Sequence, residues 1–158
     1  MIEEGHTAPD FSVPLDDGTT FSNADFGAPA TVVYFYPKDD TSGCTKEAIA
    51  FSELADEFAA LGVKVIGVSP DTIAKHEKFK AKHGLTVALA SDEDKAMVEA
   101  FGIWVEKSMY GKKYMGVERS TFLIDEAGKV AKAWRKVKVP GHAQAVLEET
   151  RALTTGKG

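Results

Sequence analysis

The chain has 158 residues, 44% hydrophobic and 27% charged, a composition typical of a globular protein that folds as one domain over residues 1–158. Its 19 basic and 24 acidic residues give a net charge of −5 without a long basic block, which argues against nucleic-acid binding. Because the chain has one cysteine, no secretory signal and no apolar stretch of the roughly 20 residues that span a bilayer, we expect a cytoplasmic protein that contacts no membrane.

The first part of the chain predicts a hairpin, a buried strand and a helix. Residues 10–22 alternate in polarity around an Asp-Asp-Gly-Thr turn, which favours a hairpin. The β-branched apolar run 31–36 predicts a buried strand, and Pro37 ends it because proline has no N–H for a central ladder. Residues 45–61 place apolar side chains at helical spacing, and Gly62 follows as a C-terminal cap.

Strands and helices continue to alternate through the middle of the chain. Residues 63–69 predict a second buried strand, and Asp71 is expected to cap a helix over about 72–83. A short strand at 87–90 is followed by a helix over 92–101, capped by its first residue, an aspartate.

The last third predicts a different arrangement. A loop or irregular hairpin is indicated over residues 103–118. Two strands joined by a turn are predicted over 120–125 and 129–136, and a final helix over 142–153. A β-α-β unit followed by β-β-α is the thioredoxin arrangement. We therefore predict an α/β, thioredoxin-like fold, with a mixed central sheet flanked by helices and an extra N-terminal hairpin.

Neither a metal site nor a bound cofactor is expected. The four histidines are scattered, and His76 and His83 have no nearby carboxylate at ligand spacing, so both are predicted to lie on the surface. The lysine-rich stretch 75–82 is interpreted as the solvated face of a helix.

Cys44 is the residue that most directly indicates chemistry. It follows a buried strand and comes at or next to a predicted helix N-terminus, where unpaired N–H groups and the macrodipole favour an anion such as a thiolate. A lone cysteine is more often a small buried hydrophobe. The turn-forming, hydroxyl-rich approach through Pro37, Thr41 and Gly43 favours a nucleophile instead. Because Thr41 and Glu47 occupy the two possible Cys-x-x-Cys positions, the chain is not a dithiol oxidoreductase.

The segment Pro37-x-x-x-Thr41-x-x-Cys44 resembles the active-site signature of the peroxiredoxins, and the surrounding sequence resembles their bacterioferritin-comigratory-protein, or Q-type, branch. The likeness runs in order through most of the chain. Besides the signature it includes residues 5–11, 33–41, 110–116, 119–125 and 134–142.

This resemblance implies a thioredoxin-like thiol peroxidase that reduces hydrogen peroxide and organic hydroperoxides. Cys44 would be the peroxidatic nucleophile, with Thr41, Pro37 and Arg119 as its partners. Attack of the thiolate on a peroxide oxygen would leave a sulfenic acid, which a thiol can reduce and a second peroxide can over-oxidise.

Arg119 and Thr41 also have simpler interpretations. Arg119 precedes a strand that should lie beside the strand leading to Cys44, so its guanidinium could reach the sulfur, although an unplaced arginine is usually in a surface salt bridge. The Thr41 hydroxyl could bond the thiolate or the peroxide, or only stabilise a local turn. Pro37 would fix the exit of the chain from the strand and exclude water. The N–H groups of Gly43 and Cys44 would donate to a peroxide oxygen.

The chain departs from the family pattern at two points. Ser42 stands where proline is frequent, and the positions where a resolving cysteine is found hold Ile49 and Lys80. The chain thus resembles the one-cysteine members. An external thiol must then complete the cycle: thioredoxin, glutaredoxin with glutathione, a small thiol, or Cys44 of another copy. A monomer or weak homodimer is expected.

Two other classes of function are alternatives to this interpretation. A cysteine phosphatase would need an arginine at position 50, which is alanine, and a cysteine protease would need a base such as His142 beside the sulfur. A binding or holdase module that has kept the fold and lost the activity would explain the missing resolving cysteine, but not the intact signature.

Overall fold

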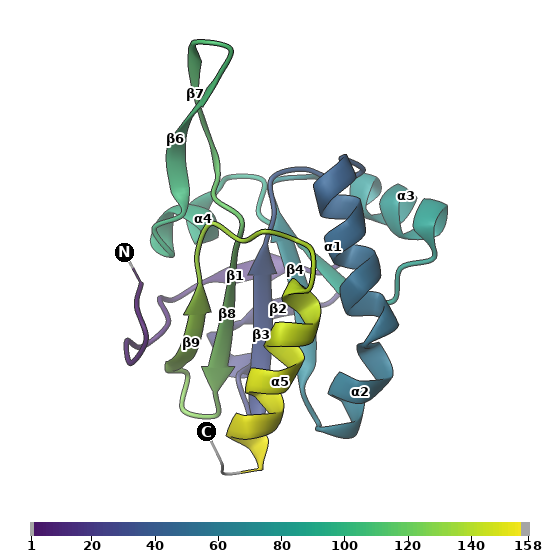
Figure 1. Ribbon diagram of the computed structural model, residues 1–158, viewed down its shortest axis with the longest axis vertical. Coiled ribbons are helices and arrows are strands. Elements are labelled where there is room, and N and C mark those ends of the chain that lie inside the picture. Colours follow the sequence, from purple (N-terminus) through teal and green to yellow (C-terminus); the bar gives the residue numbers. More distant parts are fainter. Residues whose placement is uncertain (1, 156–158) are drawn as a thin grey trace.

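The computed structural model describes residues 2–155, and a five-stranded mixed sheet forms its centre (Figure 1). The strand order is β5-β4-β3-β8-β9. β3, β4 and β5 are parallel, whereas β8 runs antiparallel to β3 and β9 antiparallel to β8. The bounds are β3 Ala30–Phe35, β4 Lys64–Ser69, β5 Ala88–Ser91, β8 Ser120–Asp125 and β9 Val130–Trp134. This is the predicted thioredoxin-like sheet.

Two hydrophobic cores cover the two faces of the sheet, because alternate residues of each strand point to opposite sides. Val32 and Tyr34 of β3 belong to one core, and Val33 and Phe35 to the other. All six residues of β3 are buried, as expected for a central strand with both faces covered.

The helices divide between these cores. The first core receives side chains from α1 (Ser42–Glu53), α2 (Ala55–Ala60), α3 (Ile73–His83) and α5 (His142–Thr154), and the second receives α4 (Ala96–Ala100). A short N-terminal hairpin also lies on the second core, as predicted, with strands β1 (Ser12–Pro14) and β2 (Thr20–Ser22) followed by the 3-10 turn η1 (Asn23–Asp25). No helix among residues 2–155 combines the length and apolar character needed to cross a membrane.

The helix predicted over 45–61 begins earlier and is interrupted. It starts at Ser42, and Leu54 separates α1 from α2 with φ −96° and ψ 5°. The N–H of Leu54 bonds the carbonyl of Phe51, three residues back, which is the tight turn that ends a helix. The consequence for the site is that Cys44 lies inside the first helical turn.

Two predicted helix caps also differ. Thr72, and not Asp71, caps α3, since its hydroxyl accepts from the N–H of Lys75 while the Asp71 carboxylate turns inward. The Asp92 carboxylate does accept from backbone N–H groups of α4, but the helix begins only at Ala96, because Lys95 adopts a left-handed conformation with φ 64°.

Residues 103–118, predicted as a loop or irregular hairpin, form a regular antiparallel hairpin. Its strands β6 (Trp104–Met109) and β7 (Lys112–Val117) project from the body of the molecule (Figure 1). Tyr110 and Gly111 have φ 53° and 79°, and two positive φ values are what a two-residue hairpin turn requires. The strands carry many exposed polar residues, so no apolar alternation marked them in the sequence.

Candidate active site

Cys44 is held at the start of α1, directly after the loop that leaves the carboxyl end of β3. The first helical hydrogen bond is donated by the N–H of Thr45 to the carbonyl of Thr41. The N–H groups of Gly43 and Cys44 therefore precede the intrahelical bonds, at the positive end of the helix macrodipole. The cysteine side chain is only 1% exposed and packs in the first core. Cys44 is thus both buried and located at the N-terminus of a helix.

Arg119 reaches the sulfur from the neighbouring strand. In the antiparallel register of β3 and β8, Phe35 lies opposite Ser120, so the preceding residue, Arg119, lies where the chain leaves β3 toward Cys44. Arg119 Nη2 is 3.3 Å from Cys44 Sγ, across 75 residues of sequence. The predicted adjacency is therefore present, and the guanidinium is mostly buried rather than in a surface salt bridge.

A second contact fixes the guanidinium. Arg119 Nη1 donates to Glu47 Oε1 at 2.6 Å, so one planar group bridges the carboxylate and the sulfur. Burial by itself lowers the pKa of Arg119, but the charges of Glu47 and Cys44 outweigh it and raise the pKa, which keeps the guanidinium cationic.

Glu47 is a site residue that the sequence interpretation missed, because it was considered only as a position lacking a second cysteine. It lies one helical turn after Cys44 and is 1% exposed. Burial raises its pKa to about 7, against the opposing effect of Arg119. Its Oε2 has no hydrogen-bond partner within residues 2–155. The three-residue spacing from Cys44, which puts both side chains on one helix face, would have indicated it.

Gly43 lies against the same guanidinium. A Cβ at this position would lie 3.1 Å from Arg119 Nη2, closer than an ordinary van der Waals contact. The missing side chain therefore lets Arg119 pass over the helix N-terminus to the sulfur.

Thr41 and Pro37 border the site without contacting the sulfur through a hydrogen bond. The Thr41 hydroxyl donates to the carbonyl of Lys38 at 2.8 Å, which is the simpler, turn-stabilising role that the sequence also allows. Thr41 is exposed, whereas Pro37 is half-buried where the chain leaves β3.

The prediction that His76 lies on the surface is wrong. His76 is 0% exposed and joins α3 to the loop before Cys44, because Nδ1 lies 2.6 Å from Asp39 Oδ2 and Nε2 lies 2.9 Å from the carbonyl of Ala90. Burial lowers the pKa of His76, but the bond to Asp39 and its charge raise it by more. Asp39 is 37 residues away in sequence, which is why spacing could not indicate the pair. His83, which is half-buried, bonds the carboxylate of Asp40.

His142 does not act on Cys44 in this structure. Its Nε2 lies 2.7 Å from the Thr121 hydroxyl, and burial, with a smaller contribution from Arg119, lowers its pKa to about 4. No cysteine–histidine pair of the protease kind is therefore formed. Across residues 2–155, no three or more histidine, cysteine or acidic side chains gather in a way that could hold a metal ion.

Known proteins resemble this chain along most of its length. The model of the AhpC/TSA family matches residues 5–133, and the Peroxiredoxin Bcp of Bacillus subtilis is 46% identical over 153 residues, 97% of this chain and 98% of that protein. The chain belongs to the Bcp, or PrxQ, family of peroxiredoxins. It is accordingly a thiol peroxidase of the thioredoxin-like fold.

Other relatives place this peroxiredoxin in the same family. Peroxiredoxin Bcp of Xanthomonas campestris is 47% identical over 143 residues, covering 90% of this chain and 89% of that protein. A solved structure of Xanthomonas campestris peroxiredoxin Q superposes with a TM-score of 0.88 at 44% identity, covering 98% of both chains. The solved structure of a cysteine-to-serine mutant of PrxQ from Xylella fastidiosa superposes with a TM-score of 0.90 at 38% identity, covering 96% of this chain and 97% of that one.

The two positions where a resolving cysteine is found in the family hold side chains with structural contacts. Ile49 of α1 is partly buried against the first core. Lys80 of α3 donates to Asp16 Oδ2 at 2.8 Å and so ties the helix to the N-terminal hairpin. Cys44 is the only cysteine of this peroxiredoxin.

Proposed function

We propose that this peroxiredoxin reduces hydroperoxides through Cys44 alone and is recycled by an external thiol. The Cys44 thiolate attacks the terminal oxygen of the peroxide, an S–O bond forms, and the O–O bond breaks. The hydroxyl stays on sulfur as a sulfenic acid, and the leaving alkoxide takes a proton to become an alcohol, or water when the substrate is hydrogen peroxide. The contact of 3.3 Å between Arg119 and the sulfur is the observation that carries this proposal.

The site residues take roles that follow from their chemistry. Arg119 stabilises the thiolate and the charge that develops on the peroxide, since its guanidinium stays charged and offers fixed donors. The N–H groups of Gly43 and Cys44 donate to a peroxide oxygen. The Thr41 hydroxyl, after rotating away from the Lys38 carbonyl, bonds the incoming peroxide. Pro37 shields the sulfur from water at the exit of β3.

Hydrogen peroxide and organic hydroperoxides are the proposed substrates. One solved relative, the bacterioferritin comigratory protein of Xanthomonas campestris, is described for its alkyl peroxide reduction activity, with 44% identity to this chain. That likeness supports alkyl hydroperoxides as substrates here.

The proposed reductant is thioredoxin or glutaredoxin with glutathione, because a chain with one cysteine cannot resolve its own sulfenic acid by an internal disulfide. The same observation supports a reducing compartment such as the cytoplasm. We propose that the protein works as a monomer or weak homodimer.

Stopped-flow oxidation of the reduced protein by hydrogen peroxide, followed by intrinsic fluorescence, tests the proposal. Wild type should oxidise far faster than free cysteine, and Cys44→Ser should show no such phase. A chase with thioredoxin, or with glutathione and glutaredoxin, then identifies the reductant. If wild type reacts no faster than free cysteine, the thiol is not activated and the binding-module interpretation takes precedence.

A further inference from the structure

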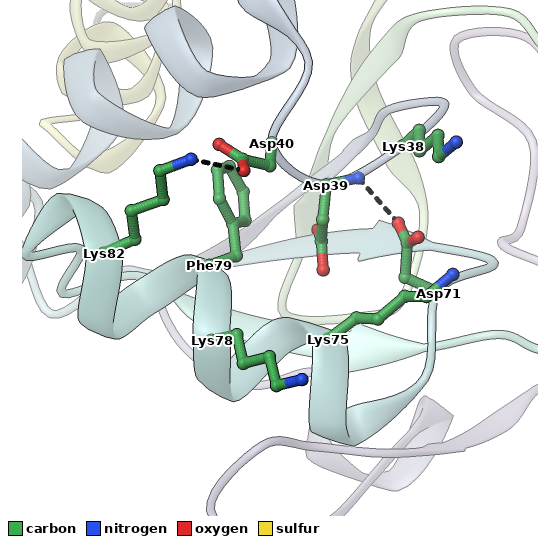
Figure 2. Close-up of a pocket in the computed structure, with 8 residues that line it drawn as sticks. All are labelled: Lys38, Asp39, Asp40, Asp71, Lys75, Lys78, Phe79 and Lys82. Atoms are coloured by element: carbon green, nitrogen blue, oxygen red, sulfur yellow. Dashed lines mark hydrogen bonds and ion pairs between the residues drawn. The ribbon is translucent and has the colours of Figure 1, made fainter.

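A cavity of about 230 Å³ lies between the loop that leads to Cys44 and helix α3 (Figure 2). Its lining combines one aromatic ring with seven charged side chains. These residues are Lys38, Asp39, Asp40, Asp71, Lys75, Lys78, Phe79 and Lys82. The mechanism proposed above uses none of them.

The basic side chains come from both walls. Lys75, Lys78 and Lys82 recur at intervals of three and four residues, which puts them on one face of α3. Figure 2 shows this face opposite the loop that carries Lys38. These lysines are exposed, as expected for the solvated face of a helix, and they also form one wall of the cavity.

The acidic side chains of the lining are mostly paired with other partners. Asp39 accepts from the Tyr36 hydroxyl and pairs with His76. Both ring nitrogens of His76 face oxygen atoms, one of a carboxyl group and one of a carbonyl, an arrangement that favours the doubly protonated ring. Asp40 is paired with Lys82 and with His83.

In the part of the chain that the structure describes, three of the lining lysines have no paired carboxylate, and one lining carboxylate, that of Asp71, has no cationic partner. The side chains of Lys38, Lys75 and Lys78 form no ion pair or hydrogen bond with any residue from 2 to 155. Asp71 accepts from the N–H of Asp39 and from the Ser69 hydroxyl. The cavity is therefore locally positive in a chain whose net charge is −5.

We propose that this cavity binds the anionic end of a small external thiol, a carboxylate-bearing molecule of the glutathione kind, that reduces the sulfenic acid of Cys44. The inference rests on the proposed function. One wall of the cavity, Lys38–Asp40, runs into the loop that ends at Cys44 four residues later. Its volume of about 230 Å³ is below the roughly 300–1,000 Å³ of pockets that enclose a whole drug-sized ligand, so it fits one end of a small molecule.

The reduction balances with two molecules of the thiol. The thiolate sulfur of the first attacks the Cys44 sulfenyl sulfur, an S–S bond forms, the S–O bond breaks, and hydroxide leaves with the thiol proton as water. A second thiol attacks the mixed disulfide, which releases the Cys44 thiol and a symmetric disulfide. The peroxide is the oxidant that the two thiols finally reduce.

Binding is tested without chemistry by titrating S-methylglutathione into Cys44→Ser by calorimetry. The affinity should fall about tenfold in Cys44→Ser carrying Lys75→Gln and Lys78→Gln, since each lost charge contact changes affinity several-fold. The matched control carries Lys112→Gln and Lys129→Gln, exposed lysines outside the cavity, and should bind as Cys44→Ser does. Absence of binding to Cys44→Ser, or equal loss in the control, overturns the proposal.

The kinetic test uses the same two pairs of lysine substitutions, introduced into the protein that keeps Cys44. After one equivalent of peroxide, reduction of the sulfenic acid by glutathione should slow about tenfold in Lys75→Gln/Lys78→Gln, while reduction by uncharged 2-mercaptoethanol and the preceding oxidation step stay at the wild-type rate. Failure to form a sulfenic acid would overturn the proposed function itself. Two other outcomes would overturn only the cavity proposal. In the first, the sulfenic acid forms normally, but Lys75→Gln/Lys78→Gln slows reduction by glutathione no more than reduction by 2-mercaptoethanol. In the second, thioredoxin reduces the sulfenic acid and glutathione does not.

Discussion

Two buried charged clusters lie beside the loop between β3 and α1, and they differ in how completely their polar atoms are paired. In the cluster of Asp39 and His76, both carboxylate oxygens and both ring nitrogens have partners. In the cluster of Cys44, Glu47 and Arg119, Glu47 Oε2 has no partner within residues 2–155, and the pKa of Glu47 is raised to about 7. A fully paired cluster suits a structural tie, whereas an incomplete one with a labile proton suits chemistry.

The hydroxyl of Tyr34 strengthens this contrast. It is the other buried side-chain polar atom without a hydrogen-bond partner in the part of the chain that the structure describes. Burial, together with the charges of Glu47 and Cys44, raises its pKa well above the usual value, so the phenol stays neutral. Of the charges that raise this pKa, those of Glu47 and Cys44 contribute more than that of Asp39.

Arg119→Ala should have the largest effect on peroxide oxidation. Loss of the guanidinium removes the charge partner of the sulfur and should slow oxidation at pH 7 by about 10²–10³-fold. Stopped-flow oxidation across pH measures this, with Arg151→Ala, which removes two surface ion pairs, as the control. An unchanged pH–rate profile for Arg119→Ala would remove this residue from the site.

Glu47→Gln should change the oxidation rate less than Arg119→Ala does, and at alkaline pH it should raise the rate instead of lowering it. The amide oxygen can still accept from Arg119, but the guanidinium no longer shares its charge with a carboxylate, so oxidation at pH 8 should be roughly threefold faster than in wild type. Because the folded pKa of about 7 lies above the unfolded value of 4.5, wild type loses stability as pH rises from 4.5 to about 7. Urea unfolding should show this loss in wild type and not in Glu47→Gln; the same slope in both would contradict the assignment.

Gly43→Ala should slow oxidation by about three- to tenfold, because the new Cβ displaces the guanidinium by a few tenths of an ångström. The free energy of unfolding should change little. Gly27→Ala, where a Cβ meets nothing within 4 Å, is the control. An oxidation rate equal to that of wild type would show that the close approach of Arg119 over this glycine is not required.

His76→Gln should barely change the oxidation rate of the folded protein and should mainly reduce stability. It leaves the Asp39 carboxylate buried without a cation, at a cost of about 3 kcal/mol in the free energy of unfolding. Since the folded pKa of His76 lies above its unfolded value of 6.5, the stabilisation is present below pH 6.5 and is lost as pH rises through the folded pKa. Urea unfolding should therefore show that wild type loses stability above pH 6.5 and that His76→Gln does not. A large fall in oxidation rate with unchanged stability would reverse the comparison of the two clusters.

The sequence predicted the fold and the centre of the site through features that depend on local pattern and strand order. Buried apolar runs marked β3 and β4, a strand was predicted at β8, and the thioredoxin-like order put Arg119 beside Cys44. Partners joined only by tertiary packing could not be found in this way. The pair of Asp39 and His76 depends on how α3 lies against the loop, and pattern alone predicted the opposite of its burial.

The β6–β7 hairpin shows a second limit of the sequence. Met109, Tyr110 and Met115 are exposed there, and Val117 is the one buried residue of the two strands, so no alternating pattern is produced. The hairpin instead follows from its turn, in which a non-glycine residue, Tyr110, adopts a positive φ. Nothing in the composition of the segment indicated that conformation.

The most direct test of the central claim is mass spectrometry of the protein after a short peroxide pulse. With Cys44 as the activated nucleophile, one oxygen, about 16 Da, should be added to the peptide that contains Cys44, and a later thiol chase should remove it. Arg119→Ala should gain this oxygen far more slowly under the same pulse. An unmodified Cys44 in a sample where free cysteine has been oxidised would contradict the account.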